Sequence, residues 1–201
     1  MELLYPFFIA FIMVFIAELG DKTQLLVLSF SGTVKTRSIV FGIALGSFFS
    51  HGIAILFGSR LGVLENENLH NIIKFITYFS FIIVGILSLL PRKQEIGSDD
   101  KKNSLMKKIF NLKLNYCFII ALSILVGEFG DKTFLASIGF GIQYPSYKFL
   151  LILGAILGMI ASDSIAIVSG KFLSKYISEE KMQKFSGILF LIFGIAGFVF
   201  K

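Results

Sequence analysis

Six long apolar runs, separated by short polar segments, constrain the fold of this chain more than any other feature. The runs cover residues 4–30, with an interruption, and residues 39–58, 72–90, 116–140, 149–170 and 185–200. A helix of about 20 apolar residues spans the hydrocarbon core of a bilayer. Only 16% of the 201 residues are charged and the mean hydropathy is +0.83, which disfavours a soluble helical bundle. The runs predict an all-α integral membrane protein with six transmembrane helices, the last beginning a few residues before position 185.

The first run is expected to be a retained span and not a signal peptide. It opens with Met1 and Glu2, so it lacks a basic leading region, and no small-residue cleavage site follows.

The single cysteine, Cys117, has no partner in the sequence, which excludes a disulfide scaffold. The net charge of +6 does not indicate a nucleic-acid partner, because most basic residues lie between the apolar runs and report membrane topology instead.

The distribution of basic residues predicts the orientation in the membrane. Segment 91–115 is the one long polar stretch of the sequence, and it carries seven of the 19 Lys and Arg residues. If the runs alternate across the bilayer, 13 basic residues fall on the side of this segment and 4 on the other, while Lys22 and Lys132 lie within runs. The positive-inside rule then places segment 91–115 in the cytoplasm and both termini outside. Short loops and an Ile, Lys and Phe bias favour a bacterial inner membrane.

The two halves of the chain are related to each other. Glu18, Gly20, Asp21, Lys22 and Thr23 (the first motif) recur 110 residues later as Glu128, Gly130, Asp131, Lys132 and Thr133 (the second motif). A second correspondence, displaced by 112 residues, relates 45–58 to 157–170 and pairs His51 with Asp163. With three runs per half, the second copy must cross the membrane in the opposite direction, as in the inverted repeats of many secondary transporters. We expect a first three-helix repeat at 1–90, a basic cytoplasmic linker at 91–115 and an inverted three-helix repeat at 116–201.

Each motif places three ionisable side chains within an apolar run. One such side chain at the centre of a membrane helix costs about 2.5–3.5 kcal/mol, so all six approach roughly 15–20 kcal/mol if left unpaired. The three ionisable side chains of each motif, at positions i, i+3 and i+4, would share one face of a helix. Gly20 and Gly130 would let another backbone approach closely or let the helix open locally. The acids are therefore expected to face one another, water or a bound cation; a salt bridge that only pins two helices is the alternative.

The paired motifs resemble the hallmark of the GDT family of divalent-cation/proton antiporters, which includes Golgi and chloroplast manganese transporters and bacterial manganese exporters. The resemblance covers essentially the whole chain. It implies transport of Mn²⁺, and in some members Ca²⁺, with the motif acids as ligands. Carried over to this sequence, the metal ligands are Glu18, Asp21, Glu128 and Asp131, and Thr23 and Thr133 are supporting hydroxyls.

The residue chemistry agrees with a cation of this class. Carboxylate, hydroxyl and carbonyl oxygens suit Mg²⁺, Ca²⁺ or Mn²⁺, whereas Zn²⁺ and Cu⁺ favour thiolate or imidazole. Gln24 could also reach the site, and Lys22 and Lys132 are expected beside the acids as counter-charges. Asp163 is a candidate proton carrier. For His51 three roles stay open: a packing residue, a proton carrier or an outer group of the metal site.

Three classes of function remain in view. The favoured one is a secondary transporter that exchanges Mn²⁺, or Ca²⁺, for protons and exports the metal from the cytoplasm. The alternatives are a divalent-cation channel and a Ca²⁺/H⁺ antiporter with little role for Mn²⁺. An enzyme is disfavoured because the sequence has no nucleophile–base pair, phosphate-binding loop or cofactor motif, and no permanent cofactor is expected. The expected partners are the metal ion, protons and the lipid bilayer.

Overall fold

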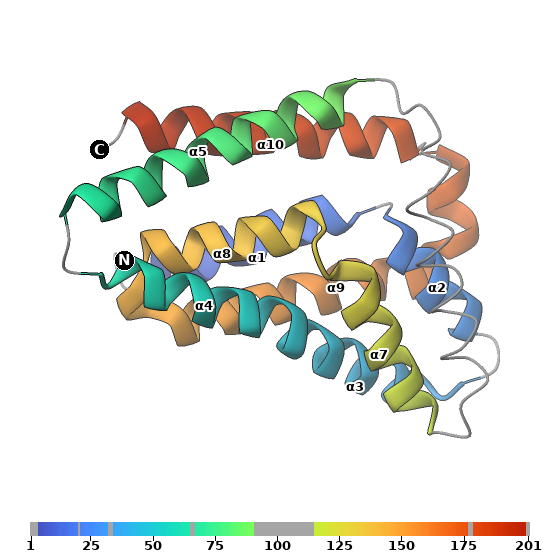
Figure 1. The fold of residues 1–201 in the computed structure, drawn as a ribbon. Coiled ribbons are helices and arrows are strands. Elements are labelled where there is room, and N and C mark those ends of the chain that lie inside the picture. Colours follow the sequence, from blue (N-terminus) through green and yellow to red (C-terminus); the bar gives the residue numbers. More distant parts are fainter. Residues whose placement is uncertain are drawn as a thin grey trace.

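The chain folds into a bundle of helices, and the part that the structure describes contains no strand. The structure is a computed structural model that describes residues 4–19, 21–31, 34–64, 67–90, 115–176 and 179–199. The α-helices are α1 (Tyr5–Glu18), α2 (Lys22–Ser31), α3 (Thr36–Ser47), α4 (Ile53–Gly62), α5 (Glu67–Leu89), α7 (Tyr116–Glu128), α8 (Lys132–Gln143), α9 (Lys148–Tyr176) and α10 (Glu179–Val199) (Figure 1).

Three stretches of helix among the described residues are long and apolar enough to cross a membrane. They are Thr36–Gly62, Asn71–Leu89 and Pro145–Ile165, and shorter apolar helices cover Tyr5–Glu18, Tyr116–Glu128 and Gly187–Val199. These six elements fall on the six predicted runs, and α10 begins at Glu179, earlier than the run at 185–200. The basic segment at 91–114, on which the predicted orientation depends, lies outside the described residues.

The helix is interrupted inside both motifs, so the prediction that the motif acids share one face of a continuous helix is wrong. Helix α1 ends at Glu18 and α2 begins at Lys22; α7 ends at Glu128 and α8 begins at Lys132. In the second motif Gly130 has a φ of +77°, and Asp131 is extended with φ −79° and ψ 172°. A left-handed φ favours glycine because it has no Cβ. Of the two roles expected for Gly130, local opening of the helix is the one found, since nothing lies within 4 Å of its Cβ position.

The second and fifth apolar runs differ in a further local feature. Between α3 and α4 the helix makes a π-helical turn, η2 (Phe48–Gly52), which contains His51. Helix α9, which carries the counterpart Asp163, runs through the equivalent region without an interruption. Because a π turn inserts one extra residue, it rotates the side chains that follow relative to a regular α-helix.

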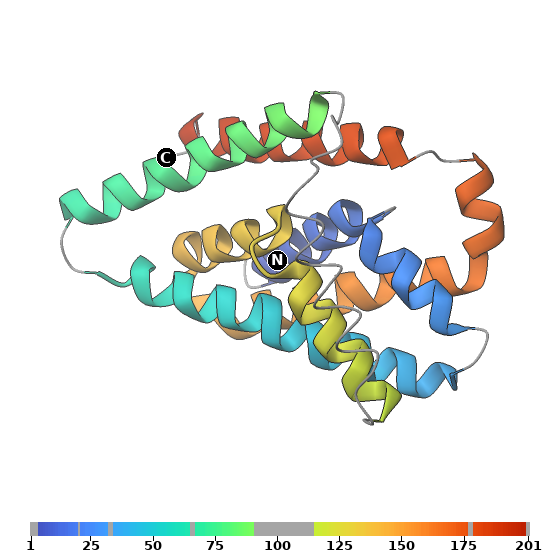
Figure 2. The same cartoon turned by 45° about the vertical axis from the view of Figure 1, so that its right-hand side comes forward.

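Helices from the two halves of the chain pack against each other in pairs. Helix α1 packs along α9, α3 along α7, α4 along α8 and α5 along α10. Figures 1 and 2 show α5 and α10 side by side along one edge of the bundle. The buried apolar core lies mainly among α1, α3, α7, α8 and α9.

The same close contact occurs twice, once from each half. A Cβ added to Gly42 of α3 would collide with the carbonyl oxygen of Cys117 in α7, and a Cβ added to Gly154 of α9 would collide with the carbonyl oxygen of Phe7 in α1. Residues 42 and 154 differ by 112, and residues 7 and 117 differ by 110, which are the displacements of the sequence repeat. A second matched pair of contacts lies one turn further along: Gly46 with Ala121, and Gly158 with Phe11.

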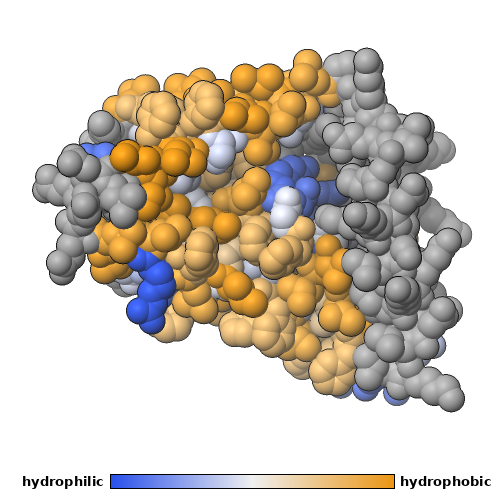
Figure 3. All heavy atoms as spheres, viewed as in Figure 1, coloured by the Kyte–Doolittle hydropathy of each residue, from blue (hydrophilic) through white to orange (hydrophobic). Residues whose placement is uncertain are grey.

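The outer surface of the bundle is strongly apolar. Large apolar side chains are exposed on several helices, among them Phe41 (69% exposed), Phe149 (70%) and Val168 (86%). Figure 3 shows this apolar face, with a hydrophilic patch in its middle near the junction of α7 and α8. An exposed apolar surface of this extent suits contact with lipid, and the polar patch marks the level of the motif.

Candidate metal-binding site between the two motifs

The two motif glutamates meet in the interior of the bundle. Glu18 is the last residue of α1 and Glu128 the last residue of α7, and their side chains are 0% and 1% exposed. Together with His51 of the π turn they offer three ligand atoms that all lie within 4.8 Å of one another. The ends of two helices from opposite halves of the chain therefore converge on one point with a third residue from the α3–α4 segment.

A threonine of the same motif supports each glutamate. The hydroxyl of Thr23 donates to Oε2 of Glu18 at 3.4 Å, and the hydroxyl of Thr133 donates to Oε2 of Glu128 at 3.0 Å. Both threonines lie in the first turn of the helix that follows the break and are buried. Oε1 of Glu18 is buried and has no hydrogen-bond partner among the described residues, so it is available to a ligand.

The motif aspartates and one motif lysine lie beside the glutamates. Nζ of Lys132 is 3.8 Å from Oδ2 of Asp21, which joins the second motif to the first; these side chains are 18% and 22% exposed. Asp21 and Asp131 both lie close enough to Glu18 and Glu128 to interact with them electrostatically. The side chain of Lys22 and residue Gly20 lie outside the described part of the chain.

Polar residues on α9 complete the surroundings. Gln24 donates to Ser162, to the carbonyl oxygen at 3.0 Å and to the hydroxyl at 2.7 Å, and so ties α2 to α9. The next residue, Asp163, is 0% exposed, and neither of its carboxylate oxygens has a hydrogen-bond partner in the described part of the chain. Asp163 lies within range of electrostatic interaction with Asp21 and Glu128. The structure thus brings Gln24 to the edge of the site, where it contacts α9.

His51 is one of the three residues at the centre of the site, whereas the sequence had left its role open. Its side chain is 0% exposed, and Nδ1 is 2.9 Å from the hydroxyl of Ser137 on α8. Ser137 in turn donates to the carbonyl oxygen of Thr133 at 2.9 Å. Ser137 was not among the residues expected at the site; its spacing of four residues from Thr133, one turn along a helix, was the signal that could have indicated it.

The charges in this cluster need compensation. Two carboxylates buried side by side in a medium of low polarity repel each other, and leaving either one charged and unpaired is expensive. Oxygen ligands of this kind suit hard divalent cations. The arrangement can therefore hold a divalent cation or take up protons in its place.

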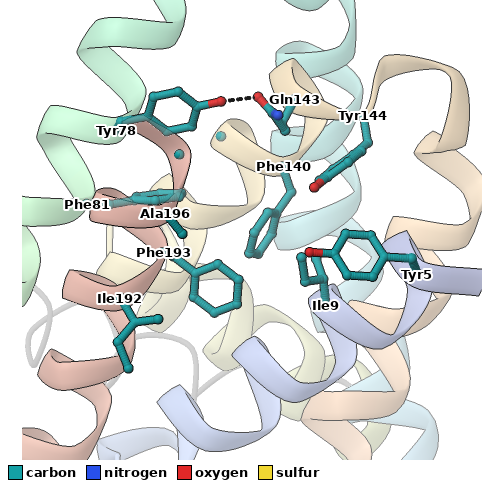
Figure 4. Close-up of a pocket in the computed structure, with 12 residues that line it drawn as sticks. Tyr5, Ile9, Tyr78, Phe81, Phe140, Gln143, Tyr144, Ile192, Phe193 and Ala196 are labelled. Carbon is teal, nitrogen blue, oxygen red and sulfur yellow. Dashed lines mark hydrogen bonds between the residues drawn. The ribbon is translucent and has the colours of Figure 1, made fainter. Parts of the chain in front are cut away.

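A separate cavity of about 330 Å³ lies away from the glutamates, between the N-terminal end of α1 and parts of α5, α8 and α10. Its polar lining consists of Tyr5, Tyr78, Gln143 and Tyr144, and Tyr78 donates to the side-chain oxygen of Gln143 (Figure 4). Phe140 and Phe81 form its apolar wall, with ring centroids 6.1 Å apart. None of the described residues that line this cavity is a carboxylate.

Comparison with known proteins decides the family. The family described as "Divalent cation/proton antiporter GDT1" matches residues 6–96 and 117–200. The chain belongs to the GDT1 family. The two matched stretches each contain one motif; the first ends inside the basic segment, at residue 96, and the second begins just after it, at residue 117. Membership supports a membrane transporter and not an enzyme.

Curated relatives extend along most of this chain. It is 27% identical to "GDT1-like protein 2, chloroplastic" of Oryza sativa subsp. japonica, with 94% of this chain and 59% of that protein aligned. It is 28% identical to "Putative manganese exporter" of Vibrio cholerae (90% and 84%) and 24% identical to "Protein PAM71, chloroplastic" of Arabidopsis thaliana (92% and 54%). The chain thus spans little more than half the length of the two chloroplast proteins. No solved structure matches it significantly.

Proposed function

We propose that this protein is a secondary transporter that exchanges a divalent cation, Mn²⁺ in preference to Ca²⁺, for protons and exports the metal from the cytoplasm. The observation that carries the proposal is the meeting of Glu18 and Glu128, one from each motif, with ligand atoms within 4.8 Å in a buried site. Such a pair is stable when neutralised by a cation or by protons, and an exchanger alternates between these two loads. The GDT1 family supports this class of transport.

The ligands assigned to the transported ion are Glu18, Asp21, Glu128 and Asp131, with Thr23 and Thr133 orienting the glutamates. Mg²⁺ dehydrates reluctantly, which favours Mn²⁺ or Ca²⁺ in an oxygen-rich site whose ligands come from the protein. The name of the Vibrio relative supports Mn²⁺ over Ca²⁺. The metal is cargo here and not a resident cofactor.

The architecture we infer for this function is a six-span membrane protein built from two inverted three-helix repeats, 1–90 and 116–201, joined by a basic linker. Support comes from the matched contacts of Gly42 with Cys117 and of Gly154 with Phe7, which reproduce the displacements of the sequence repeat. The interrupted helices at both motifs support it too, because secondary transporters place broken helices around a central substrate site. With the linker in the cytoplasm, both termini lie outside.

The tyrosine-lined cavity is proposed as the external vestibule of the transport path. It lies at the N-terminal end of α1 and the C-terminal end of α8, which face outside in this orientation. Thr133, Ser137 and Phe140 follow one another along one face of α8, and Tyr144 comes directly after the helix, so this face leads from the glutamates to the cavity. Phe140 is 4% exposed and packs against Phe81, and in this state it closes the path.

Transport in proteoliposomes tests the proposal. An imposed pH gradient should drive saturable Mn²⁺ flux, which a fluorescent indicator inside the vesicles reports. Asp21→Asn and Asp131→Asn should each abolish this flux while the variants elute as folded protein from a sizing column. Arg60→Gln, at the exposed end of α4, is the matched control and should transport normally. A conductance that persists without a pH gradient would contradict the antiporter and favour a channel.

A further inference from the structure

The strongest unassigned feature of the site is the free nitrogen of His51. Nε2 of this imidazole is buried, has no hydrogen-bond partner among the described residues and belongs to a side chain that is 0% exposed. A buried polar atom without a partner is costly and calls for an explanation. The ring lies within ligand distance of Glu18 and Glu128, since one atom from each of the three residues falls within 4.8 Å of the others.

The hydrogen bonds around His51 assign which nitrogen carries the proton. A serine hydroxyl has a single proton, and Ser137 donates it to the carbonyl oxygen of Thr133 at 2.9 Å. The 2.9 Å contact between Nδ1 of His51 and the hydroxyl of Ser137 is then a bond that the imidazole donates. Nδ1 therefore holds the proton in the neutral ring, and Nε2 presents its lone pair. A hydrogen bond of this kind on the other nitrogen is what orients histidines that bind metals.

The backbone around His51 departs from a regular α-helix. His51 lies in the π turn Phe48–Gly52, and such turns occur frequently at functional sites. Its counterpart in the other half, Asp163, lies on the continuous helix α9 and is not a member of the three-residue cluster. The two halves thus contribute equivalent glutamates to the cluster, whereas its third member, His51, comes from the first half alone, so the site is asymmetric at this position.

We propose that Nε2 of His51 is a direct ligand of the transported cation and makes the site prefer Mn²⁺ to Ca²⁺ and Mg²⁺. Ca²⁺ and Mg²⁺ take oxygen ligands, whereas first-row transition metals bind imidazole well. One nitrogen beside two carboxylates therefore discriminates against the alkaline-earth ions. It does not discriminate against later transition metals, which bind nitrogen more tightly than Mn²⁺ does. This inference rests on the proposed transport function and names a residue that determines its specificity.

Pulsed electron paramagnetic resonance of Mn²⁺ bound to the purified full-length protein tests the inference directly. Wild-type protein should show nuclear modulation from a coordinated ¹⁴N, and His51→Asn should lose it. The chain has only two histidines, so His70→Asn is the matched control and should keep the modulation. Modulation absent from the wild type, or retained in His51→Asn, would overturn the proposal.

Competition binding provides the second measurement. We expect the ratio of Mn²⁺ to Ca²⁺ affinity to fall at least tenfold in His51→Asn and to stay unchanged in His70→Asn. Ser137→Ala leaves the imidazole in place but removes the bond that orients it, and should lower the ratio by a smaller factor. Saturable Mn²⁺ binding without ¹⁴N coupling would reject His51 as a ligand and leave the transport proposal intact. No saturable Mn²⁺ binding to the wild type would overturn both.

Discussion

The ion pair between Asp21 and Lys132 joins one motif to the other at the edge of the site, with 3.8 Å between Nζ and Oδ2. Both side chains are about one fifth exposed, so water screens the pair only in part. The ammonium group competes with an incoming cation for the same carboxylate. A lysine in this position lowers the affinity for metal and helps the site to release it.

Replacing this lysine should therefore tighten metal binding. A partly exposed ion pair contributes about 1 kcal/mol, which corresponds to about a fivefold change in Kd. We expect Lys132→Gln to lower the Kd for Mn²⁺ by roughly this factor in equilibrium binding to detergent-solubilised protein. Lys148→Gln, at the start of α9, is the control and should not change the Kd. Weaker Mn²⁺ binding in Lys132→Gln would show that the lysine organises the acids and does not compete with the metal.

The sequence predicted which residues lie in this cluster better than it predicted how they are arranged. The acids were predictable because a charge within an apolar run is costly and because the set occurs twice. The pairing of Lys132 with Asp21 was not, since the spacing allowed each lysine to pair within its own helix. The approach of His51 to the glutamates was equally hidden, because it depends on how three separate helices pack.

At the scale of elements, Gly130 determines where α7 stops and α8 starts. Its φ of +77° is unfavourable for any residue with a Cβ, at a cost of about 1–2 kcal/mol. We expect Gly130→Ala to destabilise the protein by about this amount, measured by thermal unfolding in detergent, and to reduce transport because Asp131 shifts. Gly52→Ala is the control, since its added Cβ would meet only ordinary contacts at 3.7–4.0 Å, and it should be at least as stable as the wild type. Equal stability of the two variants would contradict this role for Gly130.

The external vestibule can be tested by cysteine labelling. Because Cys117 is the single cysteine, Cys117→Ser provides a cysteine-free background. In it, Ala196→Cys, which lines the cavity on α10, should react with a charged, membrane-impermeant thiol reagent added from outside. The neighbouring Ile195→Cys should not react, because the side chain at 195 is 54% exposed on the apolar surface and would face lipid. Labelling of position 196 from the cytoplasmic side alone would reverse the proposed orientation.

The helical elements followed from the apolar runs, whereas their irregularities did not. A glycine inside a helix costs only about 1 kcal/mol, so Gly130 by itself does not require a break. The break becomes favourable because it lets Asp131 leave the helix and directs two helix ends at one point. The π turn at His51 leaves still less trace in the sequence, since it changes the phase of the helix by one residue and disturbs no apolar pattern.

At the scale of the whole molecule, the repeat in the sequence predicted that two similar halves would face each other. The contact of Gly42 with Cys117 and that of Gly154 with Phe7 support the pair of related halves proposed above. What the repeat could not predict is where the halves differ. Gln24 aligns with Phe134 and His51 with Asp163, so the polar residues that the two halves bring to the site are not the same. In the proposed transporter, the two halves would provide similar glutamates, and the unmatched positions would provide the specificity.

The charge of the central site predicts an electroneutral exchange of one divalent cation for two protons. With both motif lysines beside the four motif carboxylates, as the sequence predicts, the empty site has a net charge of −2, and either one divalent cation or two protons bring it to zero. A doubly charged empty site is costly to enclose in a medium of low polarity, so it resists the change that moves access from one side to the other. A neutral, loaded site can make that change, which couples the two fluxes and prevents leakage.

Measuring Mn²⁺ flux at a fixed pH gradient, with the membrane potential clamped at zero or at a large value by valinomycin and K⁺, tests this stoichiometry. We expect equal rates at both potentials, because no net charge crosses the membrane in a one-for-two cycle. A strong dependence on potential would rule the cycle out. Asp163→Asn separates the remaining arrangements: if the pH gradient still drives transport, the motif acids carry both protons, and if that drive alone is lost, Asp163 carries one of them.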